Sequence, residues 1–237
     1  MKFVFVTTGS GYQLEQALQI FFFRENIFSI VSNTDCRALL IGNKNKIRTR
    51  IIKNDFNKKF NEYLIKHEIH YVLSQNNRII FDMEVLHKYK NKIFNLHNSI
   101  LPAFKGTYSG YQYKKNFDVS KIFENQIEYG SLVMGVTIHI VTNEIDNGYP
   151  VLVSIMNRPY YKDLKELRHL MFIKEVALML QLIKWIHDKR FFLIDKKPII
   201  KGAEFKDLEY TPNLDSIEVI EIISNLKKSG VPKPFNQ

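Results

Sequence analysis

Short apolar runs alternate with amphipathic segments over about the first hundred residues. A short apolar run between turns is typical of a buried strand, whereas apolar residues that repeat every three or four positions are typical of a helix. We expect strands at Phe3–Val6, Ile27–Val31, Ile47–Ile52, Tyr71–Leu73 and Ile93–Leu96, and helical patterns at Leu14–Phe21, Cys36–Ile41 and Phe56–His67. This alternation predicts an α/β fold with a Rossmann-like, mostly parallel open sheet and right-handed crossovers.

The second half of the chain shows a different pattern. Gly135–Val141 alternates as a strand does, and Val151–Met156 supplies a partner strand after a turn, so we expect an antiparallel strand pair. Leu164–Ile186 has the spacing of a long amphipathic helix. We predict a catalytic domain over residues 1–190 and a small C-terminal extension over residues 191–237.

Polar side chains gather where two of these strands end. Asn95 and His97 are two residues apart in a strand, so both point to the same face. Asp146 lies in the turn after the strand that ends near Val141. A single Asn or His near a strand end is more often a structural group that is hydrogen-bonded, but three such residues predict a shared site at the carboxyl edge of the sheet.

The chain has 237 residues, 45% of them hydrophobic, and a formal net charge of +10. These values are typical of a globular protein and do not indicate disorder. The densest basic run is Asn43–Arg50, but no nucleic-acid-binding motif accompanies it, so we expect no nucleic-acid partner and interpret the charge as attraction for small anions.

Targeting signals, disulfides and metal sites are not indicated by the sequence. The apolar run after Met1 is too short for a signal peptide and no later run approaches a membrane span, so we expect a cytoplasmic protein without a membrane partner. Cys36 has no second cysteine to pair with. His67, His70 and His87 lack neighbours at metal-ligand spacing, so we expect no metal.

A glycine-rich turn follows the first strand, in the run Thr7–Gly11. Such a turn directs backbone N–H groups toward whatever lies outside it, which suits an anion. Gly9 and Gly11 can equally be explained by the needs of a tight turn. The turn alone therefore does not identify a ligand.

Two motifs together resemble the formyltetrahydrofolate-dependent N-formyltransferases, whose type member acts on glycinamide ribonucleotide in purine synthesis. They are N-x-H-x-S-x-L-P from Asn95 to Pro102 and G-V-T-x-H-x-V-x-x-x-x-D-x-G from Gly135 to Gly148. The resemblance covers roughly residues 1–190. It implies N10-formyltetrahydrofolate as co-substrate, no metal, and catalysis by Asn95, His97 and Asp146 with support from His139.

The resemblance also implies residues that contact the two substrates. On the folate side these are Arg78, Ile80, Phe81, Val141 and Glu144, although Ile80 and Phe81 can also be explained as ordinary core residues. On the acceptor side they are Gly11, Tyr12, Gln13, Lys105, Tyr108, Tyr111 and Glu175. Glu175 can equally be a solvated helix carboxylate, and the aromatic and lysine-bearing stretch between Gly106 and Gly135 can be a surface insertion.

The identity of the acceptor follows from departures from the purine enzyme. Tyr12 and Gln13 replace a short hydroxyl residue and an Asn in the glycine turn, and residues 191–237 extend the chain. We therefore expect a dTDP-linked 4-amino-4,6-dideoxy sugar, or its 3-amino isomer, as a nucleotide-sugar acceptor for surface polysaccharide synthesis, with a homodimer formed through the extension. Formylation of glycinamide ribonucleotide is the alternative. Formylation of methionyl-tRNA and a catalytically inactive relative fit the sequence less well.

Overall fold

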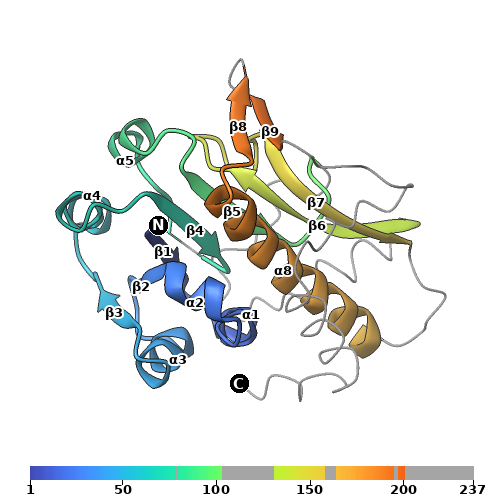
Figure 1. The fold of residues 1–237 in the computed structure, drawn as a ribbon, viewed down its shortest axis with the longest axis horizontal. Helices are drawn as coiled ribbons and strands as arrows, with labels where there is room; N and C mark the ends of the chain where they lie inside the picture. Colours follow the sequence, from blue (N-terminus) through green and yellow to red (C-terminus); the bar gives the residue numbers. More distant parts are fainter. Residues whose placement is uncertain (78, 103–130, 158–163, 195–196, 201–237) are drawn as a thin grey trace.

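A seven-stranded sheet forms the centre of the protein in a computed structural model that describes residues 1–77, 79–102, 131–157, 164–194 and 197–200 (Figure 1). Its strand order is β3-β2-β1-β4-β5-β6-β7. The first five strands in the chain are mutually parallel, and they span β1 (Phe3–Val6), β2 (Ile27–Ser32), β3 (Arg48–Ile51), β4 (Tyr71–Gln75) and β5 (Ile93–His97). The expected α/β, mostly parallel open sheet is confirmed.

The last two strands of the sheet run antiparallel. Strand β6 (Val133–Ile140) pairs with β5 and with β7 (Pro150–Asn157). The register places Asn95 opposite His139 and His97 opposite Thr137. The expected antiparallel pair is therefore present, and it brings the second polar motif beside the first.

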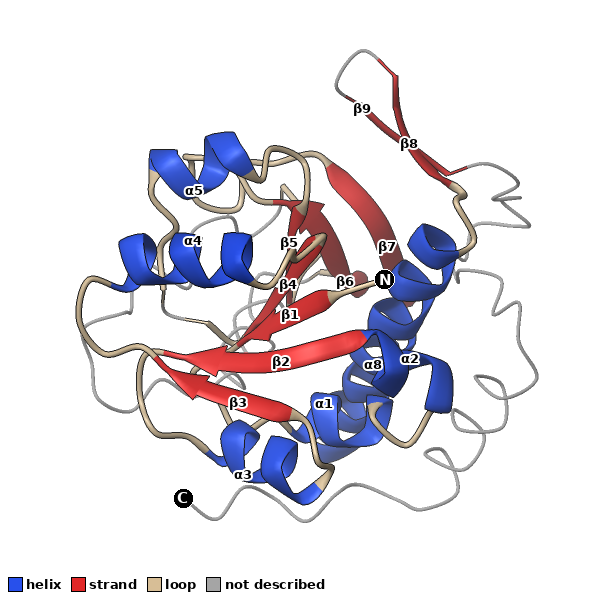
Figure 2. Cartoon of the chain, turned by 60° about the vertical axis from the view of Figure 1, so that its left-hand side comes forward, coloured by secondary structure: helices blue, strands red, loops and turns tan. Residues whose placement is uncertain are grey.

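Helices cover both faces of the sheet, as Figure 2 shows. On one face lie α1 (Tyr12–Ala17), α2 (Phe21–Asn26), α3 (Arg37–Lys44) and α8 (Leu164–His187), and on the other α4 (Phe56–Lys66) and α5 (Met83–Lys88). Helix α5 begins at an Asp82 side chain that accepts a hydrogen bond from the Val85 N–H at 3.0 Å. This cap satisfies one of the backbone donors that a helix start leaves unpaired.

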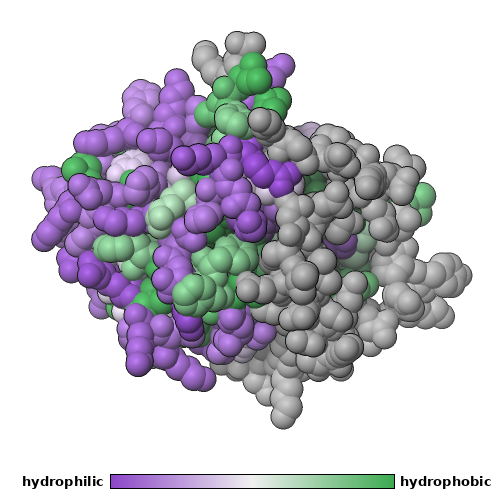
Figure 3. Space-filling model, in the orientation of Figure 1, coloured by the Kyte–Doolittle hydropathy of each residue, from purple (hydrophilic) through white to green (hydrophobic). Residues whose placement is uncertain are grey.

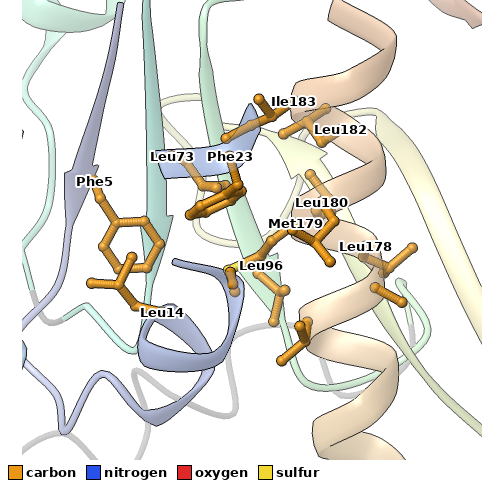
Figure 4. Close-up of a cluster of buried hydrophobic side chains, with 14 of the residues drawn as sticks. Phe5, Leu14, Phe23, Leu73, Leu96, Leu178, Met179, Leu180, Leu182 and Ile183 are labelled. Carbon is orange, nitrogen blue, oxygen red and sulfur yellow. The ribbon is translucent and has the colours of Figure 1, made fainter. Parts of the chain in front are cut away.

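Alternation along the strands divides the core between the two faces. Phe5, Leu73 and Leu96 point toward α8, where they meet side chains such as Met179 and Leu180 (Figure 4). The intervening residues, such as Val4 and Val72, pack with α4 and α5 instead. Parallel strands that are apolar on both faces need this double cover, and it leaves only the strand ends free for polar groups.

Two details of the expected helices differ in the structure. The helical spacing at Leu14–Phe21 predicts one helix, but α1 ends at Ala17 and α2 begins at Phe21. Ile20 adopts an extended conformation between them, which is incompatible with a continuous helix. The sequence did not predict α2 and α5 as separate helices, because each has only six residues, too few for a clear periodic pattern.

Beyond the sheet, β8 (Phe191–Ile194) and β9 (Lys197–Ile200) form a separate two-stranded hairpin after α8, which stands at the top of Figure 1. The remainder of the predicted extension lies outside the described residues. Over the described part of the chain, no helix is both long and apolar enough to span a membrane.

Candidate active site

A cleft opens beside the carboxyl ends of β4 and β5 and is lined on one side by residues that follow β6. It contains about 850 Å³ of space, open solvent at its mouth included. The segment after β4 forms one wall and the segment after β6 forms the other, while the end of β5 forms the floor. The lining residues are Ser74, Asn76, Asn77, Ile79, Ile80, Phe81, Asn95, Leu96, His97, Asn98, His139 and Val141 to Asp146.

Asn95 and His97 lie on the floor of the cleft, close to Asp146. The Nδ1 atom of His97 is 3.4 Å from Asp146 Oδ2, and the two side chains are only 4% and 8% exposed. At this separation and burial, a carboxylate favours the cationic form of an imidazole and restricts the orientation of its ring. The structure thus brings together the three residues that the sequence selected.

The turn between β6 and β7 positions Asp146. Its φ of 51° lies in the left-handed region, which Asp tolerates better than most residues. Gly148 packs so closely beneath the turn that a Cβ atom there would lie 1.6 Å from the carbonyl oxygen of Ile140. The backbone therefore requires glycine at this position, and this close contact determines where Asp146 can lie.

The His139 ring lies between Asn95 and Asp146. Its Nδ1 is 3.0 Å from the Ile140 carbonyl oxygen, so Nδ1 carries the proton and donates. Its Nε2 is 3.2 Å from Asn95 Nδ2 and 3.5 Å from Asp146 Oδ1. Because Nδ2 can only donate, Nε2 accepts one amide hydrogen in this arrangement. The second hydrogen on Asn95 Nδ2 remains for a group in the cleft.

Thr137 anchors the loop that follows β5. Its hydroxyl donates to the Ser99 carbonyl at 2.7 Å and accepts the Leu101 N–H at 3.1 Å, fully buried. The sequence analysis gave Thr137 no role, although its place two residues before His139 puts both on the same face of β6. The alternation of residues between the two faces of β6 was the sequence signal that could have identified Thr137.

The predicted folate-side residues lie mostly in the walls. Ile80, Val141 and Glu144 line the cleft, with Ile80 59% exposed, and Glu144 accepts a hydrogen bond from Asn147. Phe81 also lines the cleft but is 6% exposed and packs with the α4 and α5 side of the core. Arg78 lies outside the described residues.

The predicted acceptor-side residues that the structure describes do not line this cleft. Gly11 precedes α1 with a φ of 70°, and a Cβ there would lie 2.7 Å from that of Ala38, so glycine is required. The Tyr12 ring lies 4.0 Å from the Arg37 guanidinium, which also donates to the Ser10 carbonyl at 3.1 Å. Helix α3 therefore braces the glycine turn. Lys105, Tyr108 and Tyr111 lie outside the described residues.

Gln13 and Glu175 form a buried pair between α1 and α8. The Nε2 group of Gln13 donates to Glu175 Oε2, and Glu175 is only 3% exposed. Burial raises the pKa of Glu175 to about 7, although the hydrogen bond from Gln13 opposes this rise. The alternative of a solvated helix carboxylate is therefore wrong, and the pairing is a contact that sequence analysis did not predict.

Within the described residues, no cluster of three or more His, Cys, Asp or Glu side chains has the arrangement of a metal site.

Known proteins are similar to this chain in sequence. A family model described as formyl transferase matches residues 1–167. Formyltetrahydrofolate deformylase of Bacillus subtilis is 26% identical over 150 residues, 63% of this chain and 45% of that protein. Chloroplastic phosphoribosylglycinamide formyltransferase of Vigna unguiculata is 25% identical over 142 residues, 60% of this chain and 43% of that protein. The match thus spans less than half of each relative.

Solved structures show the same architecture. Phosphoribosylglycinamide formyltransferase from Anaplasma phagocytophilum superposes with a TM-score of 0.72 at 21% identity, covering 86% of this chain and 96% of that one. A formyltetrahydrofolate deformylase from Pseudomonas syringae pv. tomato superposes with a TM-score of 0.67 at 16% identity, covering 84% and 65%. At these identities the structures show a shared fold, and the family model that matches residues 1–167 shows the family. The chain belongs to the formyl transferase family.

Proposed function

We propose that this protein transfers the formyl group of N10-formyltetrahydrofolate to the primary amine of a small molecule. The observation that carries the proposal is the convergence of Asn95, His97 and Asp146 at the floor of one cleft, in a chain of the formyl transferase family. Formyl transfer needs stabilisation of a tetrahedral oxyanion and movement of one proton. The two motifs supply groups for both.

Asn95 and His97 act on the formyl oxygen. The free hydrogen of Asn95 Nδ2 and a ring N–H of cationic His97 donate to the oxyanion that forms when the amine nitrogen attacks the formyl carbon. Each such donor lowers a barrier by up to about 3–4 kcal/mol where water is excluded. His139 holds the Asn95 amide in the donating orientation through the contact between its Nε2 and Asn95 Nδ2.

Asp146 stabilises the positive charge of His97 and transfers the proton that the amine loses. Its carboxylate pairs with the imidazolium at 3.4 Å. It accepts the proton that the amine loses on forming the new C–N bond, directly or through water, and that proton passes to N10 as the old C–N bond breaks. The products are a formamide and tetrahydrofolate, so atoms and charges balance.

Two acceptors have support. Glycinamide ribonucleotide is supported by the relatives and solved structures named for that substrate. A nucleotide-linked amino sugar, such as a dTDP-linked 4-amino-4,6-dideoxy sugar, is supported by Tyr12 and Gln13, which replace a short hydroxyl residue and an Asn of the purine enzyme in the glycine turn. Because Gln13 already donates to the buried carboxyl of Glu175, an acceptor could bind that carboxyl only if Gln13 moved. The relatives favour the ribonucleotide as the first acceptor to assay.

Hydrolysis is the competing reaction. Two curated relatives are formyltetrahydrofolate deformylases, the second from Haemophilus influenzae at 22% identity over 177 residues. Water would then replace the amine as nucleophile in the same cleft. The presence or absence of amine dependence separates the two reactions.

Variants of the cleft test the assignment of roles. Asn95→Ala, His97→Ala and Asp146→Asn should each lower kcat by about 10²–10³ while the far-ultraviolet circular dichroism stays unchanged. His87→Ala, at an exposed histidine of α5, is the matched control and should retain full turnover. Near-normal turnover in the three cleft variants would refute the assignment.

A homodimer is proposed through the hairpin. Phe192, Leu193, Ile194 and Ile199 are all exposed on β8 and β9, and Figure 3 shows this apolar group at the top of the molecule. Such a concentration of exposed apolar side chains is typical of an association surface. Light scattering should show a dimer that Ile194→Ser weakens and truncation after Arg190 abolishes. An unchanged dimer in the truncated chain would rule the hairpin out.

A further inference from the structure

Strand β3 is the outermost strand of the sheet, at its lower left in Figure 2. Among the described residues it pairs only with β2, so its other side has no neighbouring strand. Arg48, Arg50 and Ile51 are exposed and Thr49 is half-buried. An exposed edge strand presents backbone donors and acceptors to any extended chain that approaches.

The side chains of β3 divide cleanly between the two faces. The Thr49 hydroxyl donates to Asn43 Oδ1 of α3 at 2.8 Å. Because strand side chains alternate, Arg48 and Arg50 point to the opposite face, the one that α4 covers. There the Arg48 guanidinium lies 4.7 Å from the centroid of the Phe28 ring.

Other cations gather around the same ring. Lys2 Nζ is 5.6 Å from the Phe28 centroid and donates to the His67 carbonyl at 2.9 Å. The His67 ring lies 5.2 Å from Phe28 and 4.6 Å from Tyr63. These contacts hold the cations in place before any partner arrives. We call Lys2, Arg48, Arg50 and Lys66 the basic cluster.

The positive charge of the basic cluster is poorly compensated. Partial burial lowers the pKa of His67, and the charges of Arg48, Lys66, Lys2 and Arg50 lower it further. The carboxylate of Glu68 lies 3.5 Å from Lys2 Nζ, but its side chain is 86% exposed, so water screens it. Figure 3 shows hydrophilic side chains over the left part of the molecule, where Figure 1 places α4 and β3.

We propose that the β3 edge binds an extended acidic segment of a partner protein by strand addition, with alternate carboxylates of that segment facing Arg48 and Arg50. Residues two apart in a strand are about 6.6 Å apart, and an added strand lies about 4.8 Å away. Alternate Asp or Glu residues would then lie directly opposite the two arginines, in the cross-strand positions where opposite charges stabilise pairing.

Other occupants fit these observations less well. A second copy pairing through β3 would set arginines against arginines, which opposes association. Single-stranded nucleic acid uses free aromatic rings as stacking platforms, but Arg48 and Lys2 lie over the Phe28 ring and His67 packs between Phe28 and Tyr63. Lys2, Phe28 and Arg48 lie at the amino ends of β1, β2 and β3, opposite the cleft, so the proposal does not depend on formyl transfer.

The test uses a fluorescently labelled peptide of alternating threonine and glutamate, measured by anisotropy with the full chain. Its matched control is the same peptide with glutamine in place of glutamate. We expect the acidic peptide to bind at least about tenfold more tightly, and the double variant Arg48→Gln/Arg50→Gln to lose this preference. An Arg48→Glu/Arg50→Glu variant should instead prefer a threonine–lysine peptide.

Hydrogen exchange distinguishes strand addition from loose electrostatic attraction. The acidic peptide should slow exchange of backbone amides in β3 and leave those of β7 unchanged. Equal binding of the glutamine peptide, unchanged exchange in β3, or tighter binding of single-stranded RNA than of the acidic peptide would each overturn the proposal.

Discussion

Replacing Glu175 with Gln should stabilise the protein at neutral and alkaline pH. Glu175 is 3% exposed and accepts a hydrogen bond from Gln13, whose own Oε1 is buried without a partner among the described residues. An amide at position 175 can accept from Gln13 Nε2 and donate to Gln13 Oε1. The variant therefore keeps the existing bond, adds a second, and removes a buried group that must ionise.

The magnitude follows from the pKa of Glu175, which burial raises from 4.5 to about 7 in the folded protein. At about 1.4 kcal/mol per pH unit, the difference corresponds to about 3 kcal/mol. Below pH 4.5 the carboxyl is protonated in both the folded and unfolded states, so it costs nothing. Between pH 4.5 and 7 the unfolded state ionises first and stability falls, and above pH 7 the loss is complete.

Urea denaturation of parent and variant from pH 4 to pH 8 measures this effect. The difference in free energy of unfolding between Glu175→Gln and the parent should rise by about 3 kcal/mol across the range, because only the parent carries the ionisation cost. Glu68→Gln, at a side chain that is 86% exposed, is the control and should show no such rise.

A difference between Glu175→Gln and the parent that does not change with pH would refute the reasoning. It would mean that the Glu175 carboxyl is solvated in the folded protein, or that it is ionised with a compensating charge. A variant that is less stable than the parent at pH 8 would show that the carboxylate–amide bond outweighs desolvation.

Two further substitutions test the contacts that position the loops beside the cleft. Gly148→Ala places a methyl group 1.6 Å from the Ile140 carbonyl oxygen, so we expect a loss of at least about 2 kcal/mol in urea denaturation and a large drop in turnover, because the turn must move. Thr137→Val leaves the Leu101 N–H and the Ser99 carbonyl without their buried partner, and should cost about 1–3 kcal/mol in the same assay.

The sequence predicted the sheet, and the convergence of Asn95, His97 and Asp146 on one cleft, because both depend on local patterns. The apolar run at Phe3–Val6 forms β1 as expected, with all four residues buried. Asn95 and His97 share a face because they are two residues apart in a strand, and that relationship needs no knowledge of tertiary structure. Asp146 was selected through its motif and lies beside His97.

Contacts between distant segments could not be predicted in this way. Gln13 and Glu175 are 162 residues apart, and neither position has a local pattern that indicates the other. The sequence left open whether the glycine turn faces a ligand, and it did not predict the contact with Arg37 of α3, because that contact depends on how two helices pack. The contacts of His139 likewise depend on the positions of its three neighbours, Asn95, Ile140 and Asp146.

The most direct test of the central claim is the release of tetrahydrofolate from N10-formyltetrahydrofolate by the purified chain, with the amine acceptor varied. We predict turnover that requires a primary amine, with the formylated product identified by mass, and we expect glycinamide ribonucleotide and dTDP-linked amino sugars to differ strongly as acceptors. Release at the same rate without any amine would contradict transfer and indicate hydrolysis.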